Sequence, residues 1–253
     1  MLNLSSLSNR SLLGKAARLP LRLVPDWMEV RVVQGPLRGK RWIAGSSNHG
    51  CWLGSYECDK QKDLAAAVRP GMVCYDVGAN VGFYTLLFSE LTGIRGTVAA
   101  FEPLPRNCRL LRRHLSLNGC ANVVVHELAL GDLDGMARFD DAAGHTQGHL
   151  SAAGVLEVRC ARIDTLVAAG AIAPPDLMKM DVEGAEAAVL KGAAEVLSRY
   201  KPAIFLATHG RQVHVECCRF LSGLGYDLAP IGGAALETCD EIVARAIRPQ
   251  ATQ

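Results

Sequence analysis

The segment Val73-Cys-Tyr-Asp-Val-Gly-Ala-Asn-Val-Gly-Phe-Tyr-Thr-Leu-Leu-Phe-Ser-Glu-Leu91 joins two apolar runs through a turn that contains glycines. The first run, 73–77, is short and unbroken, which is typical of a strand buried on both faces, and the second, 83–91, is long enough for a helix. Glycines at 78 and 82 let the turn adopt conformations and close approaches that a Cβ would hinder. The segment therefore predicts a buried strand, a tight turn and a helix.

The same alternation continues towards the C-terminus. Further strands are predicted at 97–101, 123–128, 176–180, 203–207, 226–230 and 241–247, and further helices at 103–117, 185–199 and 213–221. Residues between the third and fourth strands are interpreted as an irregular insertion. Apolar strands that alternate with helices indicate an α/β fold, a three-layer sandwich with a mostly parallel seven-stranded, Rossmann-like sheet. In such sheets ligands bind beyond the carboxyl ends of the strands, where the strand order reverses.

The chain before this sheet has a different character. Residues 28–33 and 40–44 flank a turn-rich segment and predict a small β-hairpin, and 57–68 predicts a helix that ends before Pro70-Gly71. We therefore divide the chain into an N-terminal part, 1–69, with a basic tail, the hairpin and the helix, and a main domain, 70–253. The tail has no acidic residue before Asp26, as in organelle transit peptides or membrane-surface helices, but Gly14 and Pro20 interrupt any long helix there.

The charge, the cysteines and the apolar runs of the chain exclude several classes of function. The net charge is +2 with a pI near 8.1, so no nucleic-acid partner is expected. Nine scattered cysteines without a C-x-x-C pair indicate reduced thiols, and hence a cytoplasmic location. No apolar run reaches the roughly 18 residues of a transmembrane segment. Nothing in the sequence indicates the oligomeric state.

The turn after the first strand separates two classes of nucleotide cofactor. A dinucleotide motif beginning at Gly78 would need glycine at positions 80 and 83, where this chain has Asn80 and Phe83, so a nicotinamide-dependent oxidoreductase is disfavoured. Asp76, which opens the turn, would repel a pyrophosphate but suits the α-ammonium group of S-adenosylmethionine. The spacing D-x-G-x-N-x-G resembles the first motif of class I methyltransferases.

Residues that follow the second and third strands extend this predicted site. Glu102 follows the second strand, where a carboxylate can accept hydrogen bonds from both ribose hydroxyls, although it also suits the N-terminus of the next helix. Ala129 follows the third strand and is expected to lie against the adenine, although a turn at Gly131 and Asp134-Gly135 explains this segment without a ligand. The predicted cofactor-binding residues are Asp76, Gly78, Ala79, Asn80, Gly82, Glu102 and Ala129.

The fourth and fifth strands supply the candidate catalytic residues. Asp181 and Glu183 follow the fourth strand, and alternation places Lys179 on the same face as Asp181, as in an ion-paired general base. Carboxylates also bind divalent cations, but two in one turn do not establish a metal site, and Glu183 also suits a helix N-terminus. His209, after the fifth strand, is either a general base or an ordinary loop residue.

Three blocks of sequence resemble the FkbM family of methyltransferases. They are Tyr75-Asp-Val-Gly-Ala-Asn-Val-Gly-Phe-Tyr-Thr85, Ala100-Phe-Glu-Pro103 and Lys179-Met-Asp-Val-Glu-Gly-Ala-Glu186. The resemblance implies a class I methyltransferase fold, S-adenosylmethionine as donor and O-methylation of a hydroxyl on a sugar, glycolipid or natural product. Many members have a glutamate at the end of the fifth strand, whereas this chain reads Ala207-Thr-His-Gly210, so the acceptor side is expected to differ.

Two alternatives remain beside this interpretation. Amino-methyltransferases of nucleic acids, including those of tRNA, often carry an Asn/Asp-Pro-Pro-aromatic block after the fourth strand, and this chain has Asp181-Val-Glu-Gly184 instead. The chain can also be a non-catalytic module that binds S-adenosylmethionine.

Overall fold

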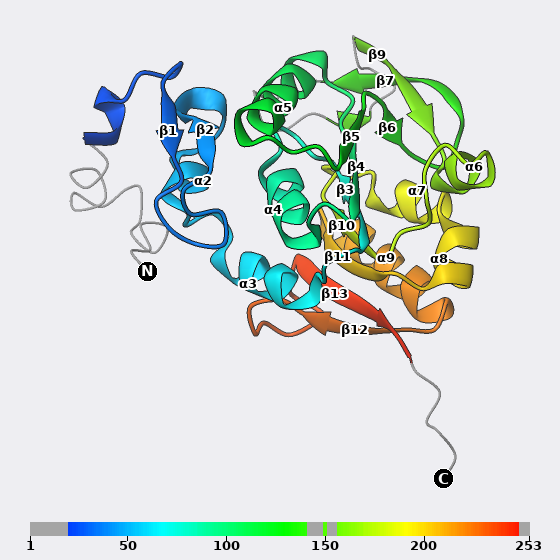
Figure 1. The fold of residues 1–253 in the computed structure, drawn as a ribbon. Helices are drawn as coiled ribbons and strands as arrows, with labels where there is room; N and C mark the ends of the chain where they lie inside the picture. The colour runs from blue at the N-terminus through cyan, green and yellow to red at the C-terminus, as the bar shows by residue number, and fades with distance from the viewer. Residues whose placement is uncertain (1–19, 141–148, 151–155, 248–253) are drawn as a thin grey trace.

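A seven-stranded sheet forms the centre of the molecule. The computed structural model describes residues 20–140, 149–150 and 156–247 of the 253-residue chain (Figure 1). The sheet consists of β3 (Val73–Val77), β4 (Thr97–Phe101), β5 (Val123–His126), β10 (Leu177–Met180), β11 (Ala203–Ala207), β12 (Tyr226–Pro230) and β13 (Glu241–Ala246). Their order is β12-β13-β11-β10-β3-β4-β5, with β13 antiparallel to both of its neighbours and the other pairs parallel. The predicted mostly parallel, seven-stranded, Rossmann-like sheet is thereby confirmed.

The order of the strands locates the binding edge. From β3 the chain adds β4 and β5 on one side and then returns to add β10 and β11 on the other, so the order reverses between β3 and β10. In sheets of this kind, ligands bind beyond the carboxyl ends of the strands on either side of such a reversal.

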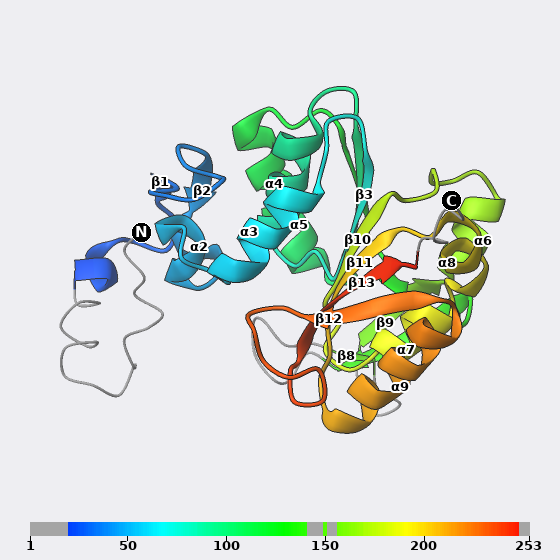
Figure 2. The same cartoon turned by 90° about the horizontal axis from the view of Figure 1, so that it is seen from below.

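Helices cover both faces of the sheet, as Figure 2 shows. On one side lie α4 (Phe83–Thr92) and α5 (Pro105–Asn118), and on the other α6 (Ile163–Ala168), α7 (Glu186–Lys191), α8 (Ala194–Tyr200) and α9 (Arg211–Gly223). Side chains of each strand alternate between two apolar cores. Cys74 and Leu177 join the core under α4, whereas Tyr75 and Met178 join the core under α7 to α9.

The N-terminal part packs against α5. β1 (Glu29–Arg31) and β2 (Arg41–Ile43) form the expected antiparallel hairpin, followed by α2 (His49–Leu53) and α3 (Cys58–Ala67). Trp42 of β2 is fully buried, and its ring stacks on His114 of α5 at a centroid distance of 3.8 Å. Trp42 also belongs to the same apolar core as Phe83 of α4. The division of the chain at residue 69 stays a prediction, and the basic tail, 1–19, lies outside the described residues.

The segment between β5 and β10 is more regular than expected. It contains a second sheet of order β6-β9-β7-β8, formed by β6 (Ala129–Leu130), β7 (Gly135–Asp140), β8 (His149–Leu150) and β9 (Leu156–Ala161). In β9, buried Val158 alternates with the exposed Glu157 and Arg159, a half-buried pattern that was present in the sequence. The interpretation of this region as irregular was wrong, because its strands pair with one another in a separate small sheet.

The helix expected at 185–199 is two helices, α7 and α8, which the Gly192-Ala193 step separates. Gly192 lies so close to Gly131 that a Cβ would be 1.8 Å from the Gly131 carbonyl oxygen. Asp164 stabilises the break, because its amide donates to the Gly192 carbonyl at 2.9 Å and its carboxylate accepts from the amides of Glu195 and Val196 at the start of α8. This contact between distant segments ends α7 early.

All nine cysteines lie in the described part of the chain, and each is a free thiol. None of the helices in the described residues is long and apolar enough to cross a bilayer.

Candidate functional site

A cavity of about 350 Å³ opens at the carboxyl ends of β3, β4 and β10. Its volume falls within the range of small-molecule sites. The loop 78–81 and Glu102 form one side, Leu128 to Leu130 a second, and Asp181 to Glu183 a third. The N-terminal part also contributes lining residues that the sequence did not indicate, namely Ser47, Asn48, Cys51 and Tyr56.

The glycines of the first turn are required by packing within the protein. Gly78 has a φ of 74°, and a Cβ there would lie 1.9 Å from the Asp181 carbonyl oxygen. Gly82 has a φ of 94°, and its Cβ would meet Leu111 of α5 at 2.2 Å. Small residues therefore bring the loop after β3 against the loop after β10, and both loops reach the cavity.

Glu102 holds the turn in place and faces the cavity. It is 5% exposed, and its Oε2 accepts the Asn80 amide at 2.8 Å while its Oε1 accepts the Leu104 amide at 3.0 Å and the Asn107 side chain at 3.1 Å. Burial raises the pKa of Glu102, and these three hydrogen bonds oppose that rise. Two of these donors, Leu104 and Asn107, lie at the start of α5, which agrees with the helix N-terminal interpretation, and the ribose interpretation stays a prediction.

Asp76 lies one layer behind the cavity. It is fully buried on the α4 side of the sheet, where its Oδ2 accepts the Thr85 hydroxyl at 2.6 Å and its Oδ1 lies 3.4 Å from Nζ of Lys179. The cavity is lined here by Gly78 and Lys179. The position differs from the direct contact with a cofactor ammonium that the sequence suggested.

Lys179 pairs with Asp76, where the sequence suggested Asp181. In the parallel pair β3–β10, Lys179 is the register partner of Asp76, so both side chains project towards α4. Its ammonium also donates to the Gly78 carbonyl at 3.0 Å and lies 5.3 Å from the Tyr84 ring centroid. Asp181 lies beyond the end of the strand, so simple alternation does not extend to it.

The remaining lining residues suit an adenine ring. Ala129, 6% exposed, lies between Leu128 and Leu130, and Phe101 borders the same cavity. An apolar surface beside a carboxylate at the end of the second strand matches the two halves of an adenosine. The residues that line the cavity therefore fit S-adenosylmethionine.

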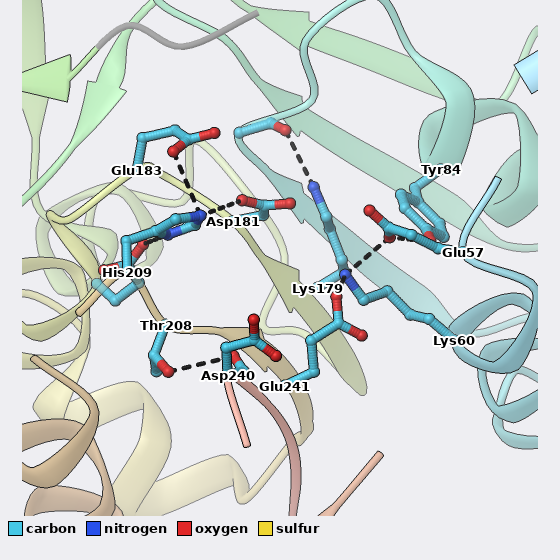
Figure 3. A network of polar contacts seen from close by, with 12 residues as sticks. Glu57, Lys60, Tyr84, Lys179, Asp181, Glu183, Thr208, His209, Asp240 and Glu241 are labelled. Carbon is cyan, nitrogen blue, oxygen red and sulfur yellow. Dashed lines mark hydrogen bonds and ion pairs between the residues drawn. The ribbon is translucent and has the colours of Figure 1, made fainter. Parts of the chain in front are cut away.

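A second cluster lies at the mouth of the cavity, where β10 and β11 end. His209 points towards Asp181 and Glu183 (Figure 3). Its Nε2 lies 3.7 Å from Asp181 Oδ1 and 3.3 Å from Glu183 Oε2. Nδ1 of the same ring forms a 2.7 Å hydrogen bond with Oε1 of Glu186, whose side chain is fully buried. The three residues selected from the ends of the fourth and fifth strands thus lie together, and Glu186 joins them through the first turn of α7.

The carboxylates change the protonation of this histidine. The hydrogen bond that His209 donates to Glu186 and the charges of Glu183, Glu186 and Asp181 outweigh burial and raise the pKa of His209 to about 9. Such an imidazole carries a proton at neutral pH and cannot accept another. This argues against His209 as the general base in this state of the site.

A network on the opposite side of the cavity was not indicated by the sequence. The buried ammonium of Lys60 pairs with Glu57 at 2.8 Å and with Glu241 of β13, and the Tyr84 hydroxyl donates to Glu57 at 2.6 Å (Figure 3). These contacts fix α3 against the sheet and thereby place Tyr56 at the cavity. The sequence did not indicate that Lys60 is buried, because it lies in a short helix among polar residues.

Comparison with known proteins agrees with this geometry. The methyltransferase FkbM domain family matches residues 76–228, more than half of the chain. The hexuronic acid methyltransferase AglP of Haloferax volcanii is 30% identical over 127 residues, which cover 49% of this chain and 51% of that protein. The 31-O-demethyl-FK506 methyltransferase FkbM of Streptomyces tacrolimicus is 43% identical over 75 residues, 30% of this chain and 25% of that protein. The matches thus span about half or less of each relative.

A solved structure supports the fold. The crystal structure of methyltransferase FkbM from Methylobacillus flagellatus KT is similar with a TM-score of 0.52 and 17% identity, over 78% of this chain and 53% of that chain.

Proposed function

Because the chain belongs to the FkbM family of S-adenosylmethionine-dependent methyltransferases, we propose that it methylates a hydroxyl oxygen on a sugar, glycolipid or natural product. One relative is named for a hexuronic acid and the other for an O-demethylated natural product, and both acceptors fit this class. The observation that carries the proposal is the pair of carboxylates, Asp181 and Glu183, at the mouth of a cavity suited to adenosine.

The donor is proposed to lie along the edge formed by β4, β3 and β10. Glu102 would accept hydrogen bonds from the ribose, with the Gly78–Gly82 turn, including Ala79 and Asn80, along the nucleoside and Ala129 against the adenine. The methionine end then lies over Gly78 and Lys179, where the Lys179 ammonium suits its carboxylate. Asp76 acts through Lys179 and Thr85, whose positions it fixes.

The acceptor side must hold a hydroxyl group and take its proton. S-adenosylmethionine supplies a methyl group on a sulfonium and needs no further activation, so the protein contributes alignment and proton transfer. An alcohol holds its proton far above neutral pH. Asp181, 22% exposed and lining the cavity, is the carboxylate we assign as proton acceptor, and Glu183 and the protonated His209 position it.

Two variants separate donor binding from proton transfer. With labelled donor and a panel of sugars, hexuronic acids and glycolipids, the wild type is expected to form S-adenosylhomocysteine. Glu102→Gln should weaken donor binding about 10- to 100-fold, because it disturbs hydrogen bonds to a charged group. Asp181→Asn should lower kcat about 10²- to 10⁴-fold with near-normal donor affinity by calorimetry.

Asp59→Asn is the matched control, because Asp59 is exposed on α3 and pairs only locally with Lys62. Donor binding without turnover on any hydroxylated acceptor would favour a non-catalytic binding module. Methylation of tRNA but of no hydroxylated small molecule would favour the nucleic-acid alternative.

A further inference from the structure

We propose that Asp181, Glu183 and His209 bind a divalent cation at the mouth of the cavity, through Oδ1, Oε2 and Nε2. The inference rests on the proposed function and deepens it, since the cation would hold the acceptor oxygen. Across the part of the chain that the structure describes, this is the one group of three metal-ligating side chains whose ligand atoms lie within 4.8 Å of one another.

The spacing of the ligand atoms suits a shared ion better than direct hydrogen bonds. Two ligand atoms about 2.1 Å from one ion, at angles of about 90° to 110°, are about 3.0–3.4 Å apart. Nε2 of His209 lies 3.3 Å from Glu183 and 3.7 Å from Asp181, which is longer than the usual hydrogen-bond distance of about 2.9 Å. Small side-chain movements would therefore complete the coordination, with the cation in place of the Nε2 proton of His209, which is released to solvent.

Glu186 orients the histidine as a metal site requires. Its Oε1 binds Nδ1 of His209 at 2.7 Å, which leaves Nε2 directed at the other two carboxylates. Histidines that ligate metals commonly have their second nitrogen held by a carboxylate in this way. Glu186 is completely buried, and its Oε2 has no hydrogen-bond partner among the described residues. Because a buried carboxylate is costly without compensating charge, Glu186 favours a cation in the cluster through the His209 ring that it holds.

The backbone directs Glu183 into the same space. Glu183 has a φ of 54° and the following Gly184 a φ of 105°, so the chain turns sharply after β10. The Gly184 amide donates to Oε1 of Glu186 at 3.0 Å, which ties this turn to the residue that holds His209. Loops after two different strands thus converge on one point.

The composition of the cluster selects the class of ion. Two carboxylate oxygens and one imidazole nitrogen suit a first-row divalent ion such as Mn²⁺ better than Ca²⁺, which prefers oxygen alone. Asp181 and Glu183 line the cavity, so the remaining coordination positions face the acceptor. A hydroxyl bound there would lose its proton more readily, and Oδ2 of Asp181 is left to accept it. The oxygen then forms the bond to the methyl carbon as the carbon–sulfur bond breaks and its electron pair stays on sulfur.

The test is direct binding of Mn²⁺ to the full chain, measured by electron paramagnetic resonance of the free ion. We expect a single site per chain. Asp181→Asn and His209→Gln should weaken it about 100-fold or more. Glu186→Gln should weaken it about 10- to 100-fold, as expected for a residue that only orients a ligand. Asp59→Asn and Glu216→Gln, both exposed ion-pair acids, are controls and should bind Mn²⁺ as the wild type does.

Calorimetry of S-adenosylmethionine in the presence of a chelator separates this inference from the proposed function. Donor binding combined with no Mn²⁺ binding, or with Mn²⁺ affinity unchanged in the three variants, overturns the metal site alone. Absence of donor binding overturns the proposed function. Melting temperatures of the variants close to that of the wild type would show that a loss of Mn²⁺ binding does not come from unfolding.

Discussion

Asp76 and Lys179 form a buried ion pair whose contribution to stability depends on both partners. Their side chains are 0% and 5% exposed, and the pair lies 3.4 Å apart between the sheet and α4. Removing one charge of such a pair leaves the other unpaired in a poorly hydrated place, which costs more than the intact pair contributes. The pair also borders the donor cavity through Lys179, so stability and binding are coupled at this point.

We expect Asp76→Asn to lower the free energy of unfolding by about 3–5 kcal/mol and to weaken donor binding, because the Lys179 ammonium then lacks its counter-charge. The double variant Asp76→Asn with Lys179→Met should recover part of the stability, since no buried charge remains. Chemical denaturation of the two variants beside wild type measures this. A single variant as stable as the wild type would contradict the mutual dependence of the two side chains.

The positions of the site residues could be predicted from the sequence, but not all of their partners. Asp181, Glu183 and His209 follow apolar strands, and parallel strands bring their carboxyl ends to one edge, so their proximity was predictable. The choice of Asp76 as partner of Lys179 depends on the register between β3 and β10, which are about a hundred residues apart along the chain. No local pattern encodes that register.

At the scale of elements, buried apolar runs made the seven strands recognisable, whereas the ends of the helices depended on distant contacts. The bounds of β3, β4, β11 and β12 match those expected. The break between α7 and α8 does not follow from helix propensity, because it is set by the approach of the loop after β6 to Gly192. Such a contact appears only once the chain is folded.

This contact predicts a difference between two helix-associated glycines. Gly192→Ala should lower the free energy of unfolding by about 1–3 kcal/mol, because its Cβ would press on the Gly131 carbonyl. Gly223→Ala is the matched control: no atom lies within 4 Å of its Cβ position at the end of α9, so the change should be neutral or slightly stabilising. Thermal or urea unfolding of both variants checks the pair, and equal stabilities would contradict the close approach.

At the scale of the whole molecule, the N-terminal part and the sheet share one core and one cavity. Leu64 of α3 and Trp42 of β2 join the core that contains Phe88 of α4. Cys51 and Tyr56 line the cavity beside the loop after β3. The hairpin was predictable as an element, but its docking on α5 was not, because it depends on contacts between distant segments, among them those of a buried histidine.

That histidine, His114, makes stability dependent on pH. Its Nε2 accepts the Ile43 amide of the hairpin at 3.1 Å, and its Nδ1 contacts the Val81 carbonyl at 2.7 Å, so the folded protein holds the neutral ring. Burial lowers the pKa of His114 from 6.5 to about 4, although the hydrogen bond to Val81 opposes the shift. Between these two values the unfolded chain binds a proton that the folded chain does not.

The unfolding free energy should therefore be unaffected by His114 above pH 6.5 and should fall by about 3 kcal/mol as the pH drops from 6.5 to 4. The measurement is urea unfolding at several pH values, followed by tryptophan fluorescence, because Trp42 stacks on the histidine. His114→Gln should remove this part of the slope, whereas His49→Gln, on α2, should retain it. The difference between wild type and His114→Gln isolates the histidine from carboxyl groups that titrate in the same range. Parallel profiles for these two proteins would mean that the hairpin does not depend on a neutral ring at this position.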